Sequence, residues 1–298
     1  MRAWILVAAF LLGGVQMAHA DMQRAERAYA SGNYRSALQH FTNAAEDGDV
    51  EAAYRAGRMY DAGRGAIADP VVALGWFRRA ADAGHVEAQR VVGIYYEEGK
   101  VVQQDYAEAA RWYEQAARAG NAKAQRNVGQ LYAHGRGVRR DLRRAVDWYA
   151  QSAAQGNAKA KRNLAYHYYF GRGVRQDRER AARLFSEAAA AGVDKAAFNL
   201  GFIYYNGEGV NKNKEMAAYH FGVAANAGNS DAQIFLGRMY LLGEGVERDP
   251  EKSYFWTLLG AAQKPSLAEY YFDKLRSELT PAQARKVRAQ ARNWLPAG

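Results

Sequence analysis

Hydrophobic and polar positions along most of this chain follow a pattern that recurs every 36 residues. Each copy contains two apolar stripes with the three-and-four spacing of one face of an α-helix. In residues 121–156, the clearest copy, the spacing predicts a first helix over about residues 121–133 and a second after residue 141. The two stripes consist of Ala124, Val128, Leu131 and Tyr132, and of Ala145, Trp148, Tyr149 and Ala153.

A loop with two glycines, Gly135 and Gly137, separates the two predicted helices. Glycine tolerates positive φ, so these residues predict a tight connection. Asp141 is a good N-cap for the second helix, and Gly156 is a good C-cap. The sequence therefore predicts a series of helix–loop–helix units. Three positions are filled identically in six units, by Tyr60, Tyr96, Tyr132, Tyr168, Tyr204 and Tyr240, by Ala52, Ala88, Ala124, Ala160, Ala196 and Ala232, and by Gly48, Gly84, Gly120, Gly156, Gly192 and Gly228.

The first helix carries a glycine in its middle, Gly129, which costs about 1 kcal/mol relative to alanine. We expect another backbone to pass close by at this position. Its counterparts are Gly57, Gly93, Gly201 and Gly237, with Ala165 as the exception. The second helices carry an aromatic stripe at helical spacing, which predicts core packing. Its members are Trp76, Trp112, Trp148, Trp256, Phe77, Tyr113 and Tyr149.

A fixed period of this length is the signature of a solenoid. The pattern GxGVxxDxxxAxxWYxxAAxxG over residues 49–264 resembles the Sel1-like repeat family, a longer-looped relative of the tetratricopeptide repeat. The resemblance implies an all-α, right-handed α–α superhelical solenoid of six such units. The departures are local: Lys100-Val101 breaks the glycine pair of the second unit, Leu184 and His220 replace tryptophan, and Thr257 replaces an aromatic residue.

The two ends of the array predict caps. Residues 21–48 resemble a shortened first unit, a tetratricopeptide-like hairpin with a tight turn. Residues 265–298 keep the register at Ala268 and contain a capping box that begins at Thr280. A charged outer face on the last helix would keep one solenoid from stacking on another.

Residues 1–20 are interpreted as a secretory signal peptide. Arg2 precedes an apolar run over residues 3–15, and Ala18-His19-Ala20 fits a cleavage site after Ala20. The run is short of the roughly 20 apolar residues that span a bilayer. We expect a periplasmic or secreted bacterial protein with no transmembrane span after cleavage; the alternative is an uncleaved anchor helix.

The sequence offers no constellation for catalysis, metal or cofactor binding. There are no cysteines, and the histidines make no HExxH or similar spacing. The glycine pairs follow a helix rather than a strand and lack the third glycine of a dinucleotide fingerprint. Non-catalytic protein binding, as adaptor, scaffold or regulator, is therefore favoured. The alternatives are an envelope enzyme, β-lactamase-like or acting on peptidoglycan, and a structural protein that binds anionic polysaccharide.

The outward stripe of the first helices is the best candidate site. In tetratricopeptide-like solenoids these helices line a concave groove, and residues four and seven apart share one stripe. Asparagine amides could bind an extended peptide backbone, lysines supply charge, and aromatic rings supply contact area. The candidate groove residues are Lys123, Asn127, Gln130, Lys159, Asn163, Tyr166, Phe170, Lys195, Asn199 and Phe202.

Charge favours an anionic partner. The formal net charge is +10, and removal of Arg2 with the leader lowers it by one. An acidic protein or peptide, and secondarily an anionic polysaccharide, fits this charge, whereas export argues against nucleic acid. A second candidate surface is a basic edge on the loops, formed by Arg136, Arg139, Arg140, Arg172 and Arg175; its alternative is a solvated edge.

Overall fold

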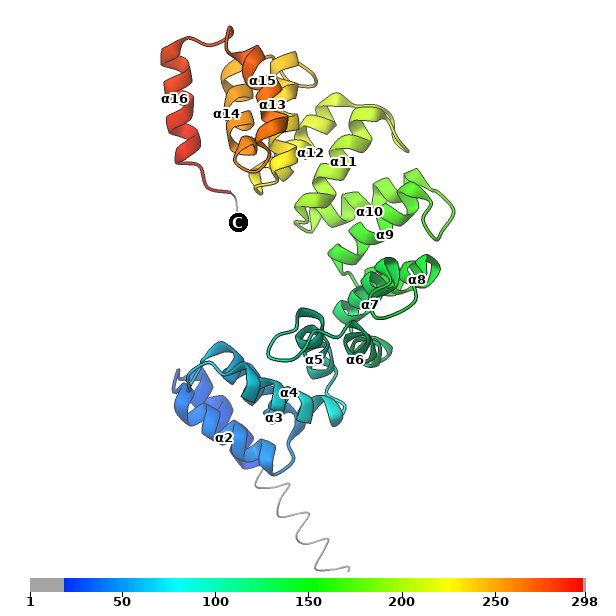
Figure 1. The fold of residues 1–298 in the computed structure, drawn as a ribbon, viewed down its shortest axis with the longest axis vertical. Helices are drawn as coiled ribbons and strands as arrows, with labels where there is room; N and C mark the ends of the chain where they lie inside the picture. Colours follow the sequence, from blue (N-terminus) through cyan, green and yellow to red (C-terminus); the bar gives the residue numbers. More distant parts are fainter. Residues whose placement is uncertain (1–18, 297–298) are drawn as a thin grey trace, which may run out of the picture. The chain divides into compact units, whose positions relative to one another are not determined.

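The structure, a computed structural model, describes residues 19–296, and over this range its regular elements are all helices (Figure 1). The chain divides into two compact units, residues 1–148 and residues 149–298. After a helix over residues 19–30, the first unit contains α2 (Tyr34–Glu46), α3 (Val50–Ala62), α4 (Pro70–Asp82), α5 (Val86–Glu98), α6 (Tyr106–Arg118) and α7 (Ala122–His134). Helix α8 (Leu142–Ala154) contains the boundary.

The second unit continues the same alternation of helices. It contains α9 (Ala158–Phe170), α10 (Arg178–Ala190), α11 (Asp194–Asn206), α12 (Lys214–Asn226), α13 (Ser230–Leu242), α14 (Pro250–Ala261), α15 (Pro265–Leu275) and α16 (Pro281–Arg292). From α2 to α7 and from α9 to α15, helices that follow one another along the chain pack against each other, and α16 packs against α14. The predicted all-α solenoid of helix–loop–helix repeats is confirmed.

Capping residues fix where the helices begin and end. The side-chain oxygen of Asn121 accepts a hydrogen bond from the Ala124 amide at the start of α7, and Gly135 ends that helix in the left-handed region at φ 71°. Asp141 then caps α8 by accepting from the amides of Arg143 and Arg144. The Asp141 amide also donates to the Tyr132 carbonyl at 3.0 Å, which closes the loop. Comparable bonds recur at Asp69, Asp105, Asp177, Asn213 and Asp249.

The core consists of small residues with a large ring at one position of the second helix, except in the last repeat, which has Thr257 there. The recurring alanines, such as Ala88 and Ala196, are fully buried, and so are the rings of Phe77, Tyr113 and Phe221. The predicted burial is confirmed for this ring position. It is only partly right for the tryptophans, since Trp112 is buried whereas Trp76, Trp148 and Trp256 are half-buried.

The expectation of a backbone beside the mid-helix glycines is confirmed at Gly237, where a Cβ would lie 3.0 Å from the Ser253 carbonyl oxygen. At Gly57 a core ring is closer than the nearest backbone oxygen, and at Gly93 and Gly201 the close neighbour is a ring, so the expectation is wrong for the last two. A Cβ on Gly57 would lie 2.8 Å from the Phe77 ring, and one on Gly201 would lie 2.7 Å from the Phe221 ring. Gly93 faces Tyr113 in the same way. The glycine therefore makes room for the core ring of the second helix.

The C-terminal helices are tied to α14. The predicted capping box is confirmed, because Thr280 and Gln283 bond each other reciprocally at the start of α16. Gln283 and Lys286 both reach Glu251 on α14. The described residues contain no helix long and apolar enough to cross a membrane. The predicted signal peptide falls almost entirely outside them.

Candidate functional site

An aromatic pocket of about 260 Å³ lies between α9 and α11. It brings together four of the predicted groove residues. Tyr166 and Phe170 come from α9, and Asn199 and Phe202 come from α11. Helical spacing positions these side chains on one face of each helix, while Phe185 of α10 and Ile203 form the buried floor.

The rings of this pocket hold one another in place. Tyr166 and Phe170 pack with ring centroids 4.5 Å apart, while 40% of the surface of the first and 48% of the second stay exposed. Phe202 packs edge-on against Phe198 at 5.0 Å and against Phe235 at 4.6 Å. These are favourable aromatic geometries, so the pocket presents fixed, accessible ring surface.

Arg172 lies over two of the pocket's rings. Its guanidinium carbon is 5.1 Å from the ring centroids of both Tyr166 and Phe170, and Nη1 donates to the Tyr166 hydroxyl at 3.2 Å. Among residues 19–296, no carboxylate pairs with Arg172. The residue was predicted as part of a basic edge, and the structure places it in the aromatic site, where it supplies a positive charge.

The wall of the pocket is fixed by Tyr169. Its hydroxyl donates to the Glu208 carboxylate, which also accepts from Asn206 at 3.2 Å and lies 3.7 Å from Arg178. Burial, followed by the bond to Glu208, raises the pKa of Tyr169 to about 12. The phenol therefore stays protonated and ties the loop after α11 to α9 at neutral pH.

The asparagines of the stripe depart from the expected role. Asn127 is buried at 5% exposure, so its predicted place on an open surface is wrong. Its Oδ1 accepts from Arg126 at 2.7 Å. Asn163 is half-buried and accepts from Arg162 at 2.5 Å, which occupies the oxygen predicted to bind a peptide. Neighbouring arginines, absent from the stripe itself, explain the difference.

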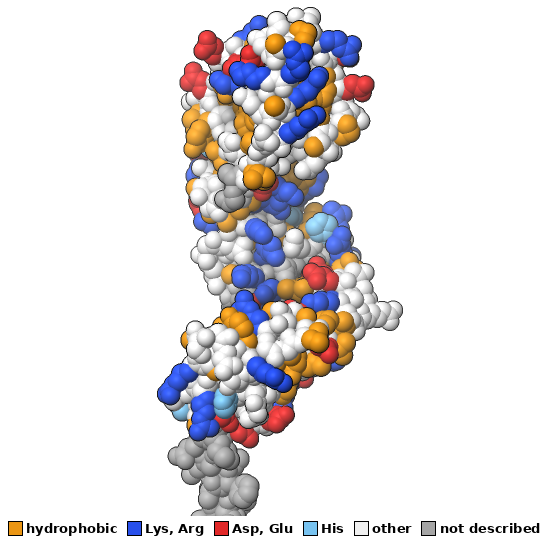
Figure 2. All heavy atoms as spheres, turned by 90° about the vertical axis from the view of Figure 1, so that its left-hand side faces the viewer, with side chains coloured by type: hydrophobic (Ala, Val, Ile, Leu, Met, Phe, Trp, Pro, Cys, Tyr) orange, Lys and Arg blue, Asp and Glu red, His pale blue; other side chains and the backbone are white. Residues whose placement is uncertain are grey.

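The remaining predicted residues are accessible. Lys123, Lys159 and Lys195 are exposed, and Gln130 is half-buried. The predicted basic edge is exposed on two loops, with Arg136, Arg139 and Arg140 after α7 and Arg172 and Arg175 after α9. Figure 2 shows Lys and Arg side chains spread over the face it presents, with hydrophobic side chains between them. The role of these charges in binding stays a prediction.

Sequence reasoning missed Tyr169, Phe198 and Phe235, whereas Asn206 lies on the predicted outward stripe. Phe235 stands one period after Asn199, so extending the stripe into the next repeat would have found it. Phe198 stands one period after Arg162, where the three preceding repeats carry arginine. That local change of residue type was the available signal for an aromatic cluster.

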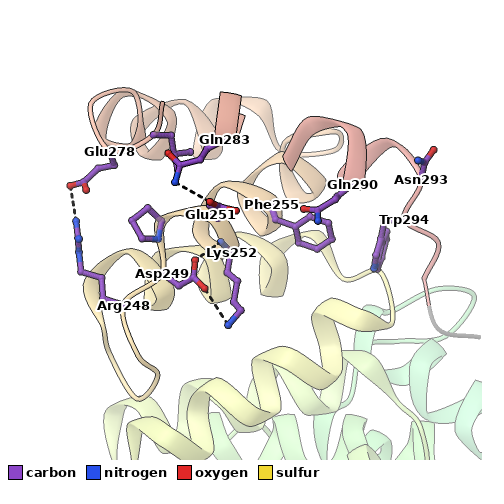
Figure 3. A pocket seen from close by; sticks show the side chains of 12 residues that line it. Arg248, Asp249, Glu251, Lys252, Phe255, Glu278, Gln283, Gln290, Asn293 and Trp294 are labelled. Carbon is purple, nitrogen blue, oxygen red and sulfur yellow. Dashed lines mark hydrogen bonds and ion pairs between the residues drawn. The ribbon is translucent and has the colours of Figure 1, made fainter. Parts of the chain in front are cut away.

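A larger cleft of about 940 Å³ lies between the start of α14 and α16 (Figure 3). Its charges are paired internally: Arg248 binds Glu278 at 2.6 Å, and Lys252 binds Asp249 at 3.2 Å. The Gln283 amide donates to Glu251 at 3.0 Å. Because its charges already have partners, this cleft offers less to a ligand than the aromatic pocket. In the described part of the chain, no group of three His, Asp, Glu or Cys side chains could hold a metal ion.

A family model, the Sel1 repeat, matches seven successive segments of the sequence. They are residues 7–49, 50–85, 86–121, 122–157, 158–193, 194–229 and 230–265. The chain belongs to the Sel1 repeat family. The first match extends the Sel1 array into the segment interpreted above as an N-terminal cap. Sel1 repeat proteins are in general protein-interaction scaffolds.

Solved structures agree with this assignment. The chain is 32% identical to c5321, a protective antigen of uropathogenic Escherichia coli, with a TM-score of 0.78. That match covers 85% of this chain and 56% of the E. coli protein, so the chain spans little more than half its length. A Sel1 repeat protein from Oxalobacter formigenes is 29% identical, with a TM-score of 0.74 over 80% of this chain and 96% of the other. No curated protein matches the sequence.

Proposed function

We propose that this Sel1 repeat protein is a non-catalytic adaptor of the bacterial cell envelope that binds an extended segment of a partner protein. The observation that carries the proposal is the accessible aromatic pocket between α9 and α11. Export rests on the leader-like residues 1–20.

The pocket suits a bulky apolar anchor from the partner. Its volume, about 260 Å³, has room for one large side chain, and its aromatic rings offer contact area at low entropic cost. Interfaces concentrate their binding energy in a few such buried anchors. Tyr166 and Phe170 are positioned by packing and by Arg172, so little ordering is needed when a ligand binds.

The charges around the pocket select an acidic segment. Arg172 has a guanidinium without a carboxylate partner in the described residues, and Lys159 and Lys195 are exposed on the same stripe. A carboxylate beside the apolar anchor would pair with the Arg172 guanidinium. Complementary charge of this kind raises the association rate and sets the register of the bound segment.

Selection from a random peptide library with the purified protein tests this proposal. We expect enrichment of peptides in which an aromatic or large aliphatic residue neighbours Asp or Glu. Tyr166→Ala combined with Phe170→Ala should weaken a selected peptide at least about 30-fold, the size of a typical hot spot.

The matched control is Gln130→Ala with His134→Ala, which changes the same two positions one repeat earlier. The control protein should bind as the wild type does, and both variants should keep the wild-type circular dichroism. Undiminished binding by the aromatic variant would overturn the proposal, as would selection of basic peptides.

A further inference from the structure

The loop between α3 and α4 exposes aliphatic side chains. Ile67 is 92% exposed, and Val71 and Val72, in the first turn of α4, are 65% and 37% exposed. None of the three belongs to the aromatic pocket or to the cleft of Figure 3. Together with Val101, described below, they form the apolar edge of the first unit.

The other repeats show that folding does not require apolar residues here. The position of Ile67 is polar or charged in each later repeat, and the position of Val71 is alanine or charged. The counterparts of Ile67 are Gln103, Arg139, Arg175, Asn211 and Glu247, and those of Val71 are Ala107, Arg143, Glu179, Glu215 and Glu251. Helix α4 begins with the same aspartate cap as its counterparts, so its local structure does not depend on these valines.

Val101 adds a fourth apolar residue to the edge at a conformational cost. It takes the place of a loop glycine and adopts φ 57°, a region that a β-branched residue rarely enters, with 45% of its surface exposed. Its glycine counterparts lie against the start of the preceding second helix: a Cβ on Gly65 would lie 2.3 Å from the Tyr34 carbonyl oxygen. One period later, the residues at the positions of Gly65 and Tyr34 are Val101 and Pro70, so Val101 is expected to lie beside Pro70 and its neighbour Val71. Strain kept at an exposed position points to a functional role.

Basic side chains border this apolar edge. A Cβ on Gly65 would lie 3.2 Å from the Arg35 amide nitrogen, so this loop passes close to Arg35. Both Arg35 and Arg64 are exposed. Arg64 stacks over Tyr34 at 5.5 Å and donates to the Tyr29 hydroxyl. Within residues 19–296, neither arginine pairs with a carboxylate.

We propose that the apolar edge of the first unit, Ile67, Val71, Val72 and Val101, inserts into an anionic lipid surface, with Arg35 and Arg64 at the headgroups. Ile67 protrudes and lines neither the aromatic pocket nor the cleft of Figure 3, which suits a fluid apolar medium. Amphipathic surfaces bind membranes through buried apolar area combined with attraction of cations to anionic lipid. This inference goes beyond the proposed function and uses other residues.

A second copy of the chain is a poorer occupant. Stable interfaces bury roughly 800 Å² from each partner, more than four aliphatic side chains supply. Two identical edges would also bring their arginines together, and the chain already carries a net charge of +10.

Co-sedimentation of the full chain with vesicles tests the proposal. Vesicles of 30 mol% phosphatidylglycerol in phosphatidylcholine should bind the protein, and pure phosphatidylcholine should bind it much less. Ile67→Ser with Val71→Ser should weaken binding at least about tenfold. The matched control, Val223→Ser, changes an exposed valine of α12 and should leave binding unchanged.

Two results would overturn the proposal: no binding of the wild type to the anionic vesicles, or equal binding by the double variant. Sedimentation-velocity measurements without lipid distinguish the second copy as occupant. If the wild type forms a dimer and the double variant does not, the apolar edge binds a second copy of the chain and not lipid. The vesicle experiment does not involve the aromatic pocket. A failure of the lipid proposal can therefore be distinguished from a failure of the proposed peptide binding.

Discussion

Helices α7 and α9 occupy the same place in successive repeats. Both bury an alanine and a branched aliphatic residue at matching positions, Ala124 and Val128 in α7 and Ala160 and Leu164 in α9. Their outward stripes diverge. Where α7 has Gln130 and His134, α9 has Tyr166 and Phe170. Repeated positions thus maintain the fold, and variable positions on the outward stripe distinguish one repeat's surface from another's.

The largest expected effect concerns the repeated part. Gly201→Val should lower the free energy of unfolding by about 3 kcal/mol, because its Cβ would meet the Phe221 ring at 2.7 Å. At the same position of α9, Ala165→Gly should cost only about 1 kcal/mol, the helix propensity difference. Urea denaturation followed by circular dichroism measures both. Equal costs would contradict the assignment of this position to ring packing.

A smaller effect of opposite sign is expected where one repeat departs from the rest. Val101→Gly should raise the free energy of unfolding by about 1 kcal/mol, because glycine adopts φ 57° without strain. Gly137→Val, the reverse change one repeat later, should be destabilising, since its Cβ would lie 2.1 Å from the Tyr106 backbone. The same denaturation assay applies, and a destabilised Val101→Gly protein would contradict the strain argument.

The smallest effect concerns the residue between the loop glycines, for example Arg136 after α7 and Glu244 after α13. Burial alone would raise the pKa of Glu244, but hydrogen bonds from Lys214 and Tyr205 and the charge of Arg238 lower it. Its contribution, under about 1 kcal/mol, is therefore fully present above the ordinary carboxyl pKa and is lost as pH falls through the lowered value.

Denaturation across pH 2–7 tests this difference between the loops. The stability gap between wild type and Glu244→Gln should narrow below about pH 4.5. Arg136 stacks over Tyr106 at 5.6 Å, so the gap for Arg136→Gln should stay constant over the same range. A constant gap for Glu244→Gln would show that its carboxylate contributes nothing through these bonds.

Much of the fold could be predicted from the sequence because it depends on positions that recur. Local chemistry repeated along the chain determines three such features. They are the bond from the Asp141 amide to a tyrosine carbonyl, the asparagine caps and the left-handed conformation of Gly135. The partner of the mid-helix glycines could not be predicted in the same way. Periodicity places Gly201 on a buried face, but it does not say whether a ring or a backbone lies opposite.

The candidate site was predictable only in part. Helical spacing put Tyr166, Phe170 and Phe202 on the outward stripe, and the structure brings them together. Burial of Asn127 depends on how Arg126 folds back over it, and the place of Arg172 above two rings depends on the loop conformation. Both depend on the direction that a long arginine side chain takes, which the helical spacing of residues does not determine.

The most direct test of the central claim is calorimetric. One acidic peptide selected from the library is titrated into the wild type, the α9 variant Tyr166→Ala with Phe170→Ala, and the α7 variant Gln130→Ala with His134→Ala. We predict a dissociation constant at least about 30-fold higher for the α9 variant and an unchanged one for the α7 variant. Equal losses in both variants, or none in either, would contradict the conclusion that α9 carries the binding surface.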